Sequence, residues 1–136
     1  IFSDPEKAAP MLTALTQQDD EDLDLRTSAA RLIIEADPKS EILTRLATNY
    51  DKLPVDLRRR IASIAAGAKE APGAAAFVVS FLKDNEKDLA RYRQQVLYSV
   101  NLTLTPELTE VLTALTQDPD KYLKAAAESA LKRLQK

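Results

Sequence analysis

The sequence predicts an all-α fold in which about four antiparallel helix pairs stack into an α-solenoid, and three observations support this prediction. The six residues at 12–17, Leu-Thr-Ala-Leu-Thr-Gln, return unchanged at 112–117. Prolines that suit helix starts recur at intervals of 33, 34 and 34 residues. Two different apolar patterns alternate along the chain. A repeated helix pair of this size cannot bury its apolar face alone, so neighbouring pairs are expected to stack side by side.

Each of these prolines lies where the first helix of a repeat is expected to begin. Proline suits the first helical position because its missing N–H would have no intrahelical acceptor there, and an Asp or Thr before it is a good N-cap. Three of the four sites have both features, and the third site lacks the cap. The sites are Asp4-Pro5, Asp37-Pro38, Ala71-Pro72 and Thr105-Pro106. They divide a single domain, 1–136, into repeats at about 4–36, 37–70, 71–104 and 105–136.

The first helix of each repeat carries two adjacent apolar residues and then a leucine. Spacings of three and four place such residues on one face of a helix. These groups are Met11-Leu12 with Leu15, Ile42-Leu43 with Leu46, Val78-Val79 with Leu82, and Val111-Leu112 with Leu115. We expect the four helices to end near positions 17, 49, 83 and 117, where polar, turn-forming residues follow.

The second helix of each repeat opens with an apolar residue and a basic one, followed three positions later by an apolar or small residue. These groups are Leu25-Arg26 with Ala29, Leu57-Arg58 with Ile61, Tyr92-Arg93 with Val96, and Leu123-Lys124 with Ala127. The expected helices cover roughly 21–36, 53–69, 86–102 and 119–135. No segment alternates with period two between turn glycines, so no strand is expected.

A period of about 34 residues is also typical of the tetratricopeptide repeat, but its large aromatic positions would fall on Pro10 and Gln17. The chain instead resembles the HEAT-repeat family, with its leucine-rich first helix, Asp-rich turn, and second helix that opens with an apolar residue and Arg. The strongest matches run from Asp20 to Leu25-Arg26-Thr27-Ser28-Ala29-Ala30 and from Asp118-Pro119-Asp120 to Leu123-Lys124-Ala125-Ala126-Ala127. Repeat 3 departs from the pattern, with Tyr92 where Leu is usual. The resemblance covers essentially the whole chain and implies a right-handed, HEAT- or armadillo-like superhelix whose second helices line the concave side.

A basic residue recurs at the start of every second helix, at Arg26, Arg58, Arg93 and Lys124. The resemblance implies that this row is structural and bridges to turn aspartates of the same or the neighbouring repeat. The alternative is a row that binds a ligand. Partly buried, charge-assisted hydrogen bonds contribute more than isolated surface pairs, which favours the structural interpretation.

The densest positive cluster is Arg58-Arg59-Arg60, and Arg91 lies on the next second helix. Packed helices lie about 10 Å apart, so Arg59, Arg60 and Arg91 could form one positive patch. Exposed Arg and Tyr are enriched in binding hot spots, which adds Tyr98 and the intervening Gln94 to the expected partner-binding surface. The alternative is a solvated surface in which these arginines balance nearby acids.

The absence of two residue types argues against most catalytic and metal chemistry. The chain has no histidine and no cysteine, which removes the usual general base, the thiol nucleophile and the commonest metal ligands. The acidic turn at 19–24 lacks the glycine and the ligand spacing of a calcium loop, and its acids are expected to stabilise the following helix N-terminus. The sequence therefore predicts that the chain is not an enzyme and has no catalytic residues, no metal and no cofactor.

The net charge of −2 and a pI near 5.2 favour a protein partner over a polyanion. We therefore expect a non-catalytic protein–protein interaction or scaffold module that holds its partner on the second-helix face. One alternative is nucleic-acid binding, since some HEAT-like solenoids process damaged DNA bases. A less favoured alternative is a HEAT-like enzyme or a chromophore-attachment protein.

The sequence also leads to expectations about membrane insertion, processing, compartment and oligomeric state. No apolar run approaches the roughly 20 residues that span a bilayer, so no membrane insertion is expected. The chain starts at Ile1, which suggests a trimmed or processed chain or an excised segment. The lack of an apolar signal stretch slightly favours the cytoplasm, with a processed or exported chain left open. The terminal helices lack a strongly polar outer face. Such uncapped ends favour homo-oligomerisation or continuation into a larger chain.

Overall fold

The computed structural model describes residues 23–84 and 86–135, and every regular element among them is a helix. The α-helices are α2 (Leu23–Ala36), α3 (Ile42–Thr48), α4 (Val55–Gly67), α5 (Ala74–Leu82), α6 (Ala90–Ser99), α7 (Pro106–Leu115) and α8 (Lys121–Leu134). Two short 3-10 helices are η1 (Tyr50–Lys52) and η2 (Lys87–Leu89). The all-α prediction is therefore confirmed. The predicted first helix and positions 19–22 of the acidic turn lie outside the described residues, as do the side chains of Leu23, Asp24 and Leu25.

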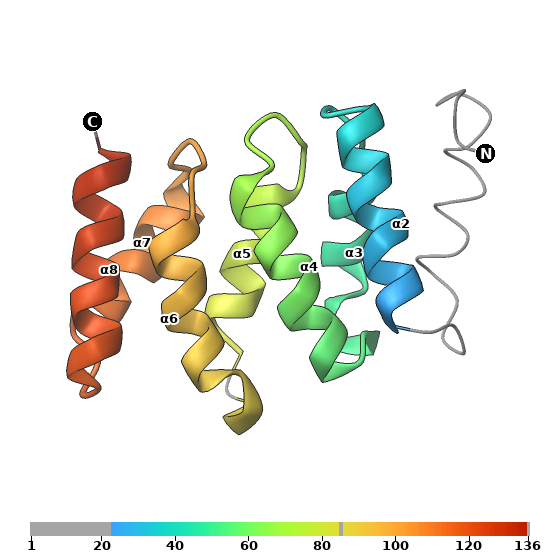
Figure 1. Ribbon diagram of the computed structural model, residues 1–136. Coiled ribbons are helices and arrows are strands. Elements are labelled where there is room, and N and C mark those ends of the chain that lie inside the picture. The colour runs from blue at the N-terminus through green and yellow to red at the C-terminus, as the bar shows by residue number, and fades with distance from the viewer. Residues whose placement is uncertain (1–22, 85, 136) are drawn as a thin grey trace.

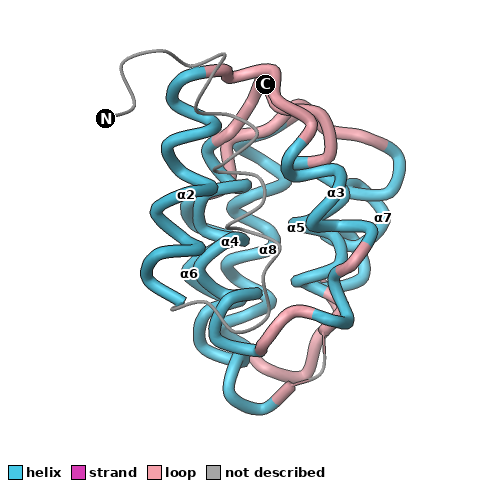
Figure 2. The backbone as a smooth tube through the Cα atoms, turned by 90° about the vertical axis from the view of Figure 1, so that its right-hand side faces the viewer, coloured by secondary structure: helices cyan, strands magenta, loops and turns pink. Residues whose placement is uncertain are grey.

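The helices form two layers. In one layer α2, α4, α6 and α8 lie side by side in chain order (Figure 1). The other layer holds α3, α5 and α7, as the turned view shows (Figure 2). Contacts of α4 with α5 and of α7 with α8 join the two layers. The alternation of apolar patterns therefore corresponds to an alternation between layers, because every predicted second helix lies in the α2–α4–α6–α8 layer.

The core lies between the layers and is built from the apolar stripes of the repeats. Every described member of the first-helix pattern is buried, as is Phe77 of α5. On the second helices, half of the buried positions that the structure describes are alanines, whose small side chains let helix backbones approach closely. These alanines are Ala29, Ala30, Ala62, Ala65, Ala66, Ala126, Ala127 and Ala130. The core thus combines large side chains of α3, α5 and α7 with many small ones of α2, α4 and α8, whereas α6 buries Val96 and Leu97.

The prolines mark helix starts less directly than predicted. Pro106 is the first residue of α7, and Thr105 caps the helix by accepting a hydrogen bond of 3.1 Å from the backbone N–H of Leu108. At the second site the prediction is wrong, because α3 begins only at Ile42. Asp37 instead closes a local turn, in which its carboxylate accepts from the N–H of Lys39 at 3.2 Å.

The start of α5 also differs from the prediction, because the helix begins at Ala74, directly after Gly73, and not at Pro72. Gly73 has a positive φ of 83° at the N-cap position, a conformation that L-residues rarely adopt. A Cβ atom built on Gly73 would lie 2.4 Å from the backbone nitrogen of Thr44 in α3. The missing cap at this site is therefore explained by a close contact between α5 and α3 that only glycine allows.

Candidate functional site

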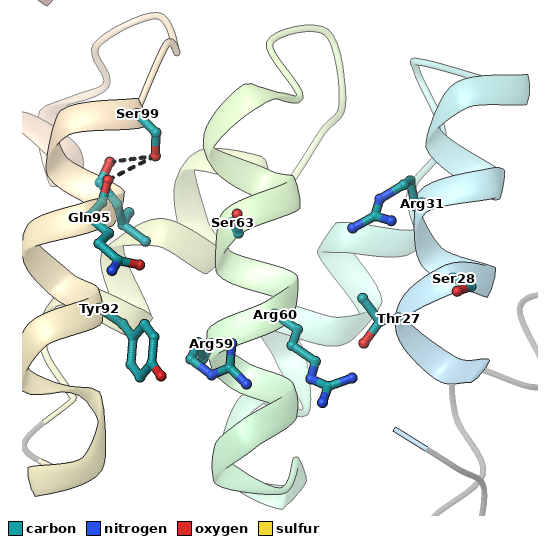
Figure 3. A pocket seen from close by; sticks show the side chains of 10 residues that line it. Thr27, Ser28, Arg31, Arg59, Arg60, Ser63, Tyr92, Gln95 and Ser99 are labelled. Carbon is teal, nitrogen blue, oxygen red and sulfur yellow. Dashed lines mark hydrogen bonds between the residues drawn. The ribbon is translucent and has the colours of Figure 1, made fainter. Parts of the chain in front are cut away.

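An open groove of about 460 Å³ crosses α2, α4 and α6 (Figure 3). Three arginines line it, and no acidic residue is among the described residues of its lining. The remaining lining is mostly hydroxyl and amide groups. The lining residues are Thr27, Ser28 and Arg31 from α2, Arg59, Arg60 and Ser63 from α4, and Tyr92, Gln95, Val96 and Ser99 from α6.

The helical period of α4 explains why its polar residues gather in this groove. Leu57 and Ile61 are each 1% exposed and anchor one side of α4 in the core. Arg59, Arg60 and Ser63 lie between and beyond these positions, so they project from a different side of the helix. The same apolar stripe that fixes α4 in the fold therefore presents its arginines to the groove.

A carboxylate on α4 holds the two α4 arginines together. One oxygen of Asp56 accepts hydrogen bonds from Nε and Nη2 of Arg59, the first at 3.0 Å, and the other pairs with Nε of Arg60 at 3.0 Å. The hydrogen bonding by Arg59, with the positive charge of both arginines, holds the pKa of Asp56 below its usual range. Asp56 therefore stays ionised at neutral pH and orients two guanidinium groups with a single negative charge.

Tyr92 connects the α4 arginines to α6. The guanidinium of Arg59 lies 4.6 Å from the centre of the Tyr92 ring, and that of Arg91 lies 5.0 Å from it. Arg91 Nη2 also donates a hydrogen bond of 2.9 Å to the Tyr92 hydroxyl, which lowers the pKa of this phenol. Cation–π contacts of this kind are weak but orient guanidinium groups over a ring. The arginines of neighbouring helices are thus held around one aromatic side chain.

The structure places the predicted partner-binding residues at different distances from the groove. Arg59 and Arg60 line it, and Arg91 lines an adjoining recess of about 490 Å³ that also includes Arg59. Gln94 is half-buried on α6, and Tyr98 is 51% exposed there, and both lie outside the two linings. The structure therefore places Arg59 and Arg91 against Tyr92, and Arg60 is joined to Arg59 through Asp56.

Of the groove residues, only Arg59 and Arg60 were predicted from the sequence, and the most consequential of the others are Arg31 and Tyr92. Tyr92 carried a signal, because it stands where the repeat pattern has leucine. Its half-buried ring accommodates the contacts with Arg59 and Arg91 that a leucine could not make. Arg31 carried no such signal, because it belongs to no repeated position. Its place in the groove depends on how α2 packs beside α4.

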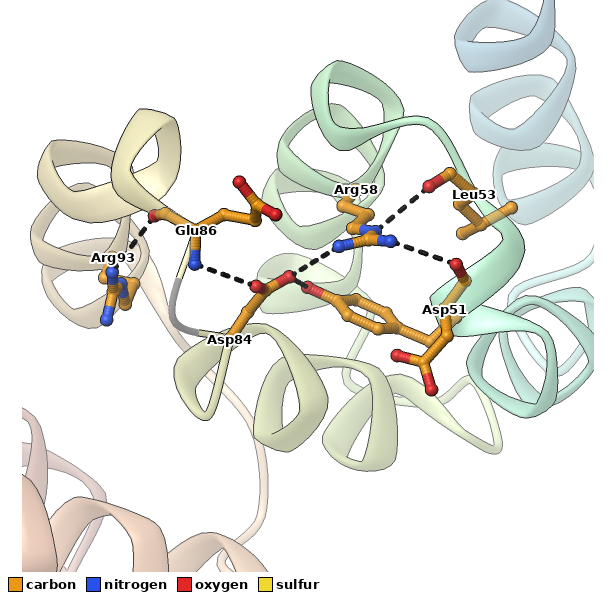
Figure 4. Close-up of polar contacts among 7 residues, drawn as sticks. Asp51, Leu53, Arg58, Asp84, Glu86 and Arg93 are labelled. Carbon is orange, nitrogen blue, oxygen red and sulfur yellow. Dashed lines mark hydrogen bonds and ion pairs between the residues drawn. The ribbon is translucent and has the colours of Figure 1, made fainter.

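Within the predicted basic row, Arg58 takes part in a network of hydrogen bonds and an ion pair (Figure 4). Its Nη1 pairs with Asp84 at 3.1 Å, Nε donates to the Leu53 carbonyl at 3.0 Å, and Nη2 donates to the Asp51 carbonyl at 3.0 Å. The Tyr50 hydroxyl donates a hydrogen bond of 2.7 Å to the same Asp84 oxygen. Asp84 follows α5, so this network joins a turn aspartate of the following repeat to α4 and η1.

Both acidic groups of this network have shifted pKa values. Burial opposes ionisation of Asp84, but hydrogen bonds from Tyr50, the Glu86 N–H and Arg58 outweigh it and hold the pKa of Asp84 below its usual range. Burial, and then the bond to Asp84, raises the pKa of Tyr50 far above its usual range. At neutral pH the network therefore contains an ionised Asp84, a neutral Tyr50 and a charged Arg58.

The other members of the row have different surroundings. Arg26 is 1% exposed in α2. Arg93 is half-buried, and its Nη2 donates a hydrogen bond of 3.3 Å to the Glu86 carbonyl. Lys124 is exposed on α8 and forms no ion pair with the residues that the structure describes. Arg58 therefore makes the contact with a turn aspartate that the resemblance implies. The side chain of Lys124 is exposed to solvent instead.

Two kinds of feature are absent from the residues that the structure describes. No group of three or more Asp, Glu, His or Cys side chains in 23–84 and 86–135 is arranged to hold a metal ion. Over the same residues, no helix has both the length and the apolar character needed to cross a membrane. Comparison of the chain with family models, with curated proteins and with solved structures gave no match.

Proposed function

We propose that this chain is a non-catalytic protein-interaction module, built as a HEAT-like solenoid of about four repeats, that binds an acidic protein segment across α2, α4 and α6. One observation carries the proposal. The groove over these helices presents Arg31, Arg59 and Arg60, while the described part of its lining holds no acidic residue. A surface of this kind is complementary to a negatively charged segment, and charge complementarity favours specific and rapid association.

The layered packing supports the solenoid part of the proposal. Each helix of the groove contacts the next one in its layer, as expected when repeats stack in one direction. Such stacking produces an extended surface on one layer, to which several helices contribute. The predicted residues Arg59, Arg60 and Arg91 would lie at the centre of the bound segment, with Gln94 and Tyr98 farther along α6.

The residue types argue against catalysis at this groove. A chain with no histidine and no cysteine would have to use carboxylates, Lys, Arg, Tyr or hydroxyl groups as acid, base and nucleophile. The serines of the lining have no general base beside them among the described lining residues. Binding, which needs only donors and charge, is the activity that these side chains support best.

The nucleic-acid alternative has less support from this groove. Single-stranded nucleic acids bind grooves in which aromatic rings stack on bases. Tyr92 is the one aromatic residue in the described lining, and its ring already lies against the guanidinium groups of Arg59 and Arg91. A chain with a net charge of −2 also attracts phosphate backbones weakly outside such a patch.

The test is a pull-down from extract of the source cells with the tagged chain, with and without nuclease. Arg31→Glu reverses one groove charge without breaking any ion pair or hydrogen bond of the described residues. Arg45→Glu is the matched control, because Arg45 is exposed in α3 on the other layer. We expect a defined protein to be captured by the wild type and by Arg45→Glu, and to be lost with Arg31→Glu.

Two results would contradict the proposal. Capture that persists with Arg31→Glu would place the partner outside the groove. Capture that disappears after nuclease treatment would favour the nucleic-acid alternative instead. Reversal of both Arg59 and Arg60 is a poorer test, because it would leave the carboxylate of Asp56 facing two further carboxylates one turn away.

A further inference from the structure

The arginines of the groove come from two different helices. Arg31 extends from α2 and Arg60 from α4 into the space between these helices, and Arg59 lies toward Tyr92 on α6 (Figure 3). A ligand that contacts arginines of both helices must therefore present several acceptor oxygens in different directions. A carboxylate offers only two oxygens in one plane, which suits guanidinium groups on one side of it, as Asp56 binds Arg59 and Arg60 of a single helix.

The charge of the site also distinguishes between acidic ligands. Asp56 shares its single negative charge between Arg59 and Arg60, and Arg31 adds a positive charge from the facing helix. A phosphomonoester carries a charge of about −1.5 to −2 at neutral pH and three terminal oxygens. With a third oxygen and more charge than a carboxylate, it can contact the guanidinium groups of both helices more fully.

Neutral donors are available beside the arginines. Ser28 on α2 and Ser63 on α4 line the groove, are exposed, and make no hydrogen bond among the described residues. Their hydroxyl groups can donate to phosphate oxygens that the arginines leave unfilled. The Ser99 hydroxyl, by contrast, is already used in bonds of 3.0 and 3.2 Å to the carbonyls of Gln95 and Val96. Two of the available donors therefore lie on the same helices as Arg31 and Arg60, and the exposed Gln95 amide on α6 is a third.

We propose that the groove recognises a phosphorylated serine or threonine side chain within the acidic partner segment, held between Arg31 of α2 and the Arg59 and Arg60 pair of α4. This inference rests on the proposed protein-binding function and specifies its ligand. A groove of about 460 Å³ can enclose one such side chain with its flanking backbone.

The experiment compares three peptide libraries, each with degenerate acidic flanks and one fixed central position. The central residue is phosphoserine or phosphothreonine in the first, serine or threonine in the second, and glutamate in the third. The proteins are the wild-type chain, Arg31→Glu and Arg45→Glu, each shown by circular dichroism and thermal unfolding to be folded. Two further probes, vesicles that contain phosphorylated inositol lipids and a single-stranded oligonucleotide, carry phosphate from other sources.

We expect the phosphorylated library to bind the wild type at least about tenfold more tightly than the glutamate library. The affinity of Arg31→Glu for the phosphorylated library should be at least about tenfold lower than that of the wild type, which is the loss expected for one charge-assisted hydrogen bond. Arg45→Glu should keep the wild-type affinity. Amide resonances of α2, α4 and α6 should shift when the phosphopeptide binds. The vesicles and the oligonucleotide should bind more weakly than the phosphopeptides.

Four results would overturn the inference. They are equal binding of the phosphorylated and glutamate libraries, unchanged phosphopeptide affinity with Arg31→Glu, tighter binding of the vesicles or the oligonucleotide, and no binding of any library. If the pull-down still captures a protein in an Arg31-dependent manner, the protein-binding function survives and only the phosphate specificity fails. If that capture also fails, the proposed function itself is wrong.

Discussion

Asp84→Ala is expected to lower the free energy of unfolding by about 3 kcal/mol, the lower part of the range for removal of one partner from a buried ion pair. The side chains of Asp84 and Arg58 are only 9% and 14% exposed. Removing the carboxylate leaves the Arg58 guanidinium without its counter-ion and the Tyr50 hydroxyl without its acceptor. Urea unfolding followed by circular dichroism measures the change.

The matched control is Asp118→Ala in the following repeat. Asp118 occupies the corresponding turn, where its carboxylate accepts a hydrogen bond of 2.9 Å from the Asp120 N–H, just as Asp84 accepts one of 3.1 Å from the Glu86 N–H. Asp118 forms no ion pair within 23–84 and 86–135, so its replacement should cost only about 1 kcal/mol. Equal costs for the two variants would show that the turn, rather than the network with Arg58, provides the stability.

The same network predicts a pH dependence with a definite sign. The pKa of Asp84 is lower in the folded chain than in the unfolded one, so its contribution is fully present above about pH 4, the ordinary value for an aspartate. The contribution is lost as the pH falls through the lower, folded-state pKa. The difference in stability between the wild type and Asp84→Ala should therefore be large at pH 7 and shrink below pH 4. A difference that stays constant into this acidic range would contradict the ionised state of Asp84.

The apolar stripes made the helices predictable, because burial of these stripes is what stabilises them. The spacing of Ile42, Leu43 and Leu46 predicts both that α3 is a helix and which of its faces is buried. The helix ends were less predictable, since they depend on competing local hydrogen bonds. Asp37 could serve as an N-cap or close its own turn, and nothing in the sequence distinguishes these two outcomes.

The candidate site was predictable only as far as single helices determine it. The run of arginines on α4 identified Arg59 and Arg60, and helix periodicity placed them away from the core. Arg31 could not be found in this way, because it joins the groove only through the lateral packing of α2 on α4. Tyr98 was predicted from its residue type, and it is exposed, but the groove does not extend to its position on α6.

Gly73→Ala is expected to lower the free energy of unfolding by about 3 kcal/mol, for two separate reasons. A non-glycine residue at a φ of 83° costs about 1–2 kcal/mol. The new Cβ would also lie 2.4 and 2.5 Å from the backbone N and Cα of Thr44, atoms that cannot turn aside as a side chain could. Relief of that overlap requires α5 to move away from α3, and overpacking of this kind costs about 1–3 kcal/mol.

Gly67→Ala is the internal control for this prediction, because it makes the same chemical change in a different environment. Gly67 ends α4 without a positive φ, and a Cβ at this position would meet no atom within 4 Å. Alanine should therefore leave the stability unchanged or raise it by up to about 1 kcal/mol, since it restricts the unfolded chain and favours the helix. Gly73→Ala should thus lower the urea midpoint clearly, whereas Gly67→Ala should leave the midpoint unchanged or raise it. If Gly73→Ala is as stable as Gly67→Ala, the close contact between Gly73 and Thr44 does not limit the residue type at position 73.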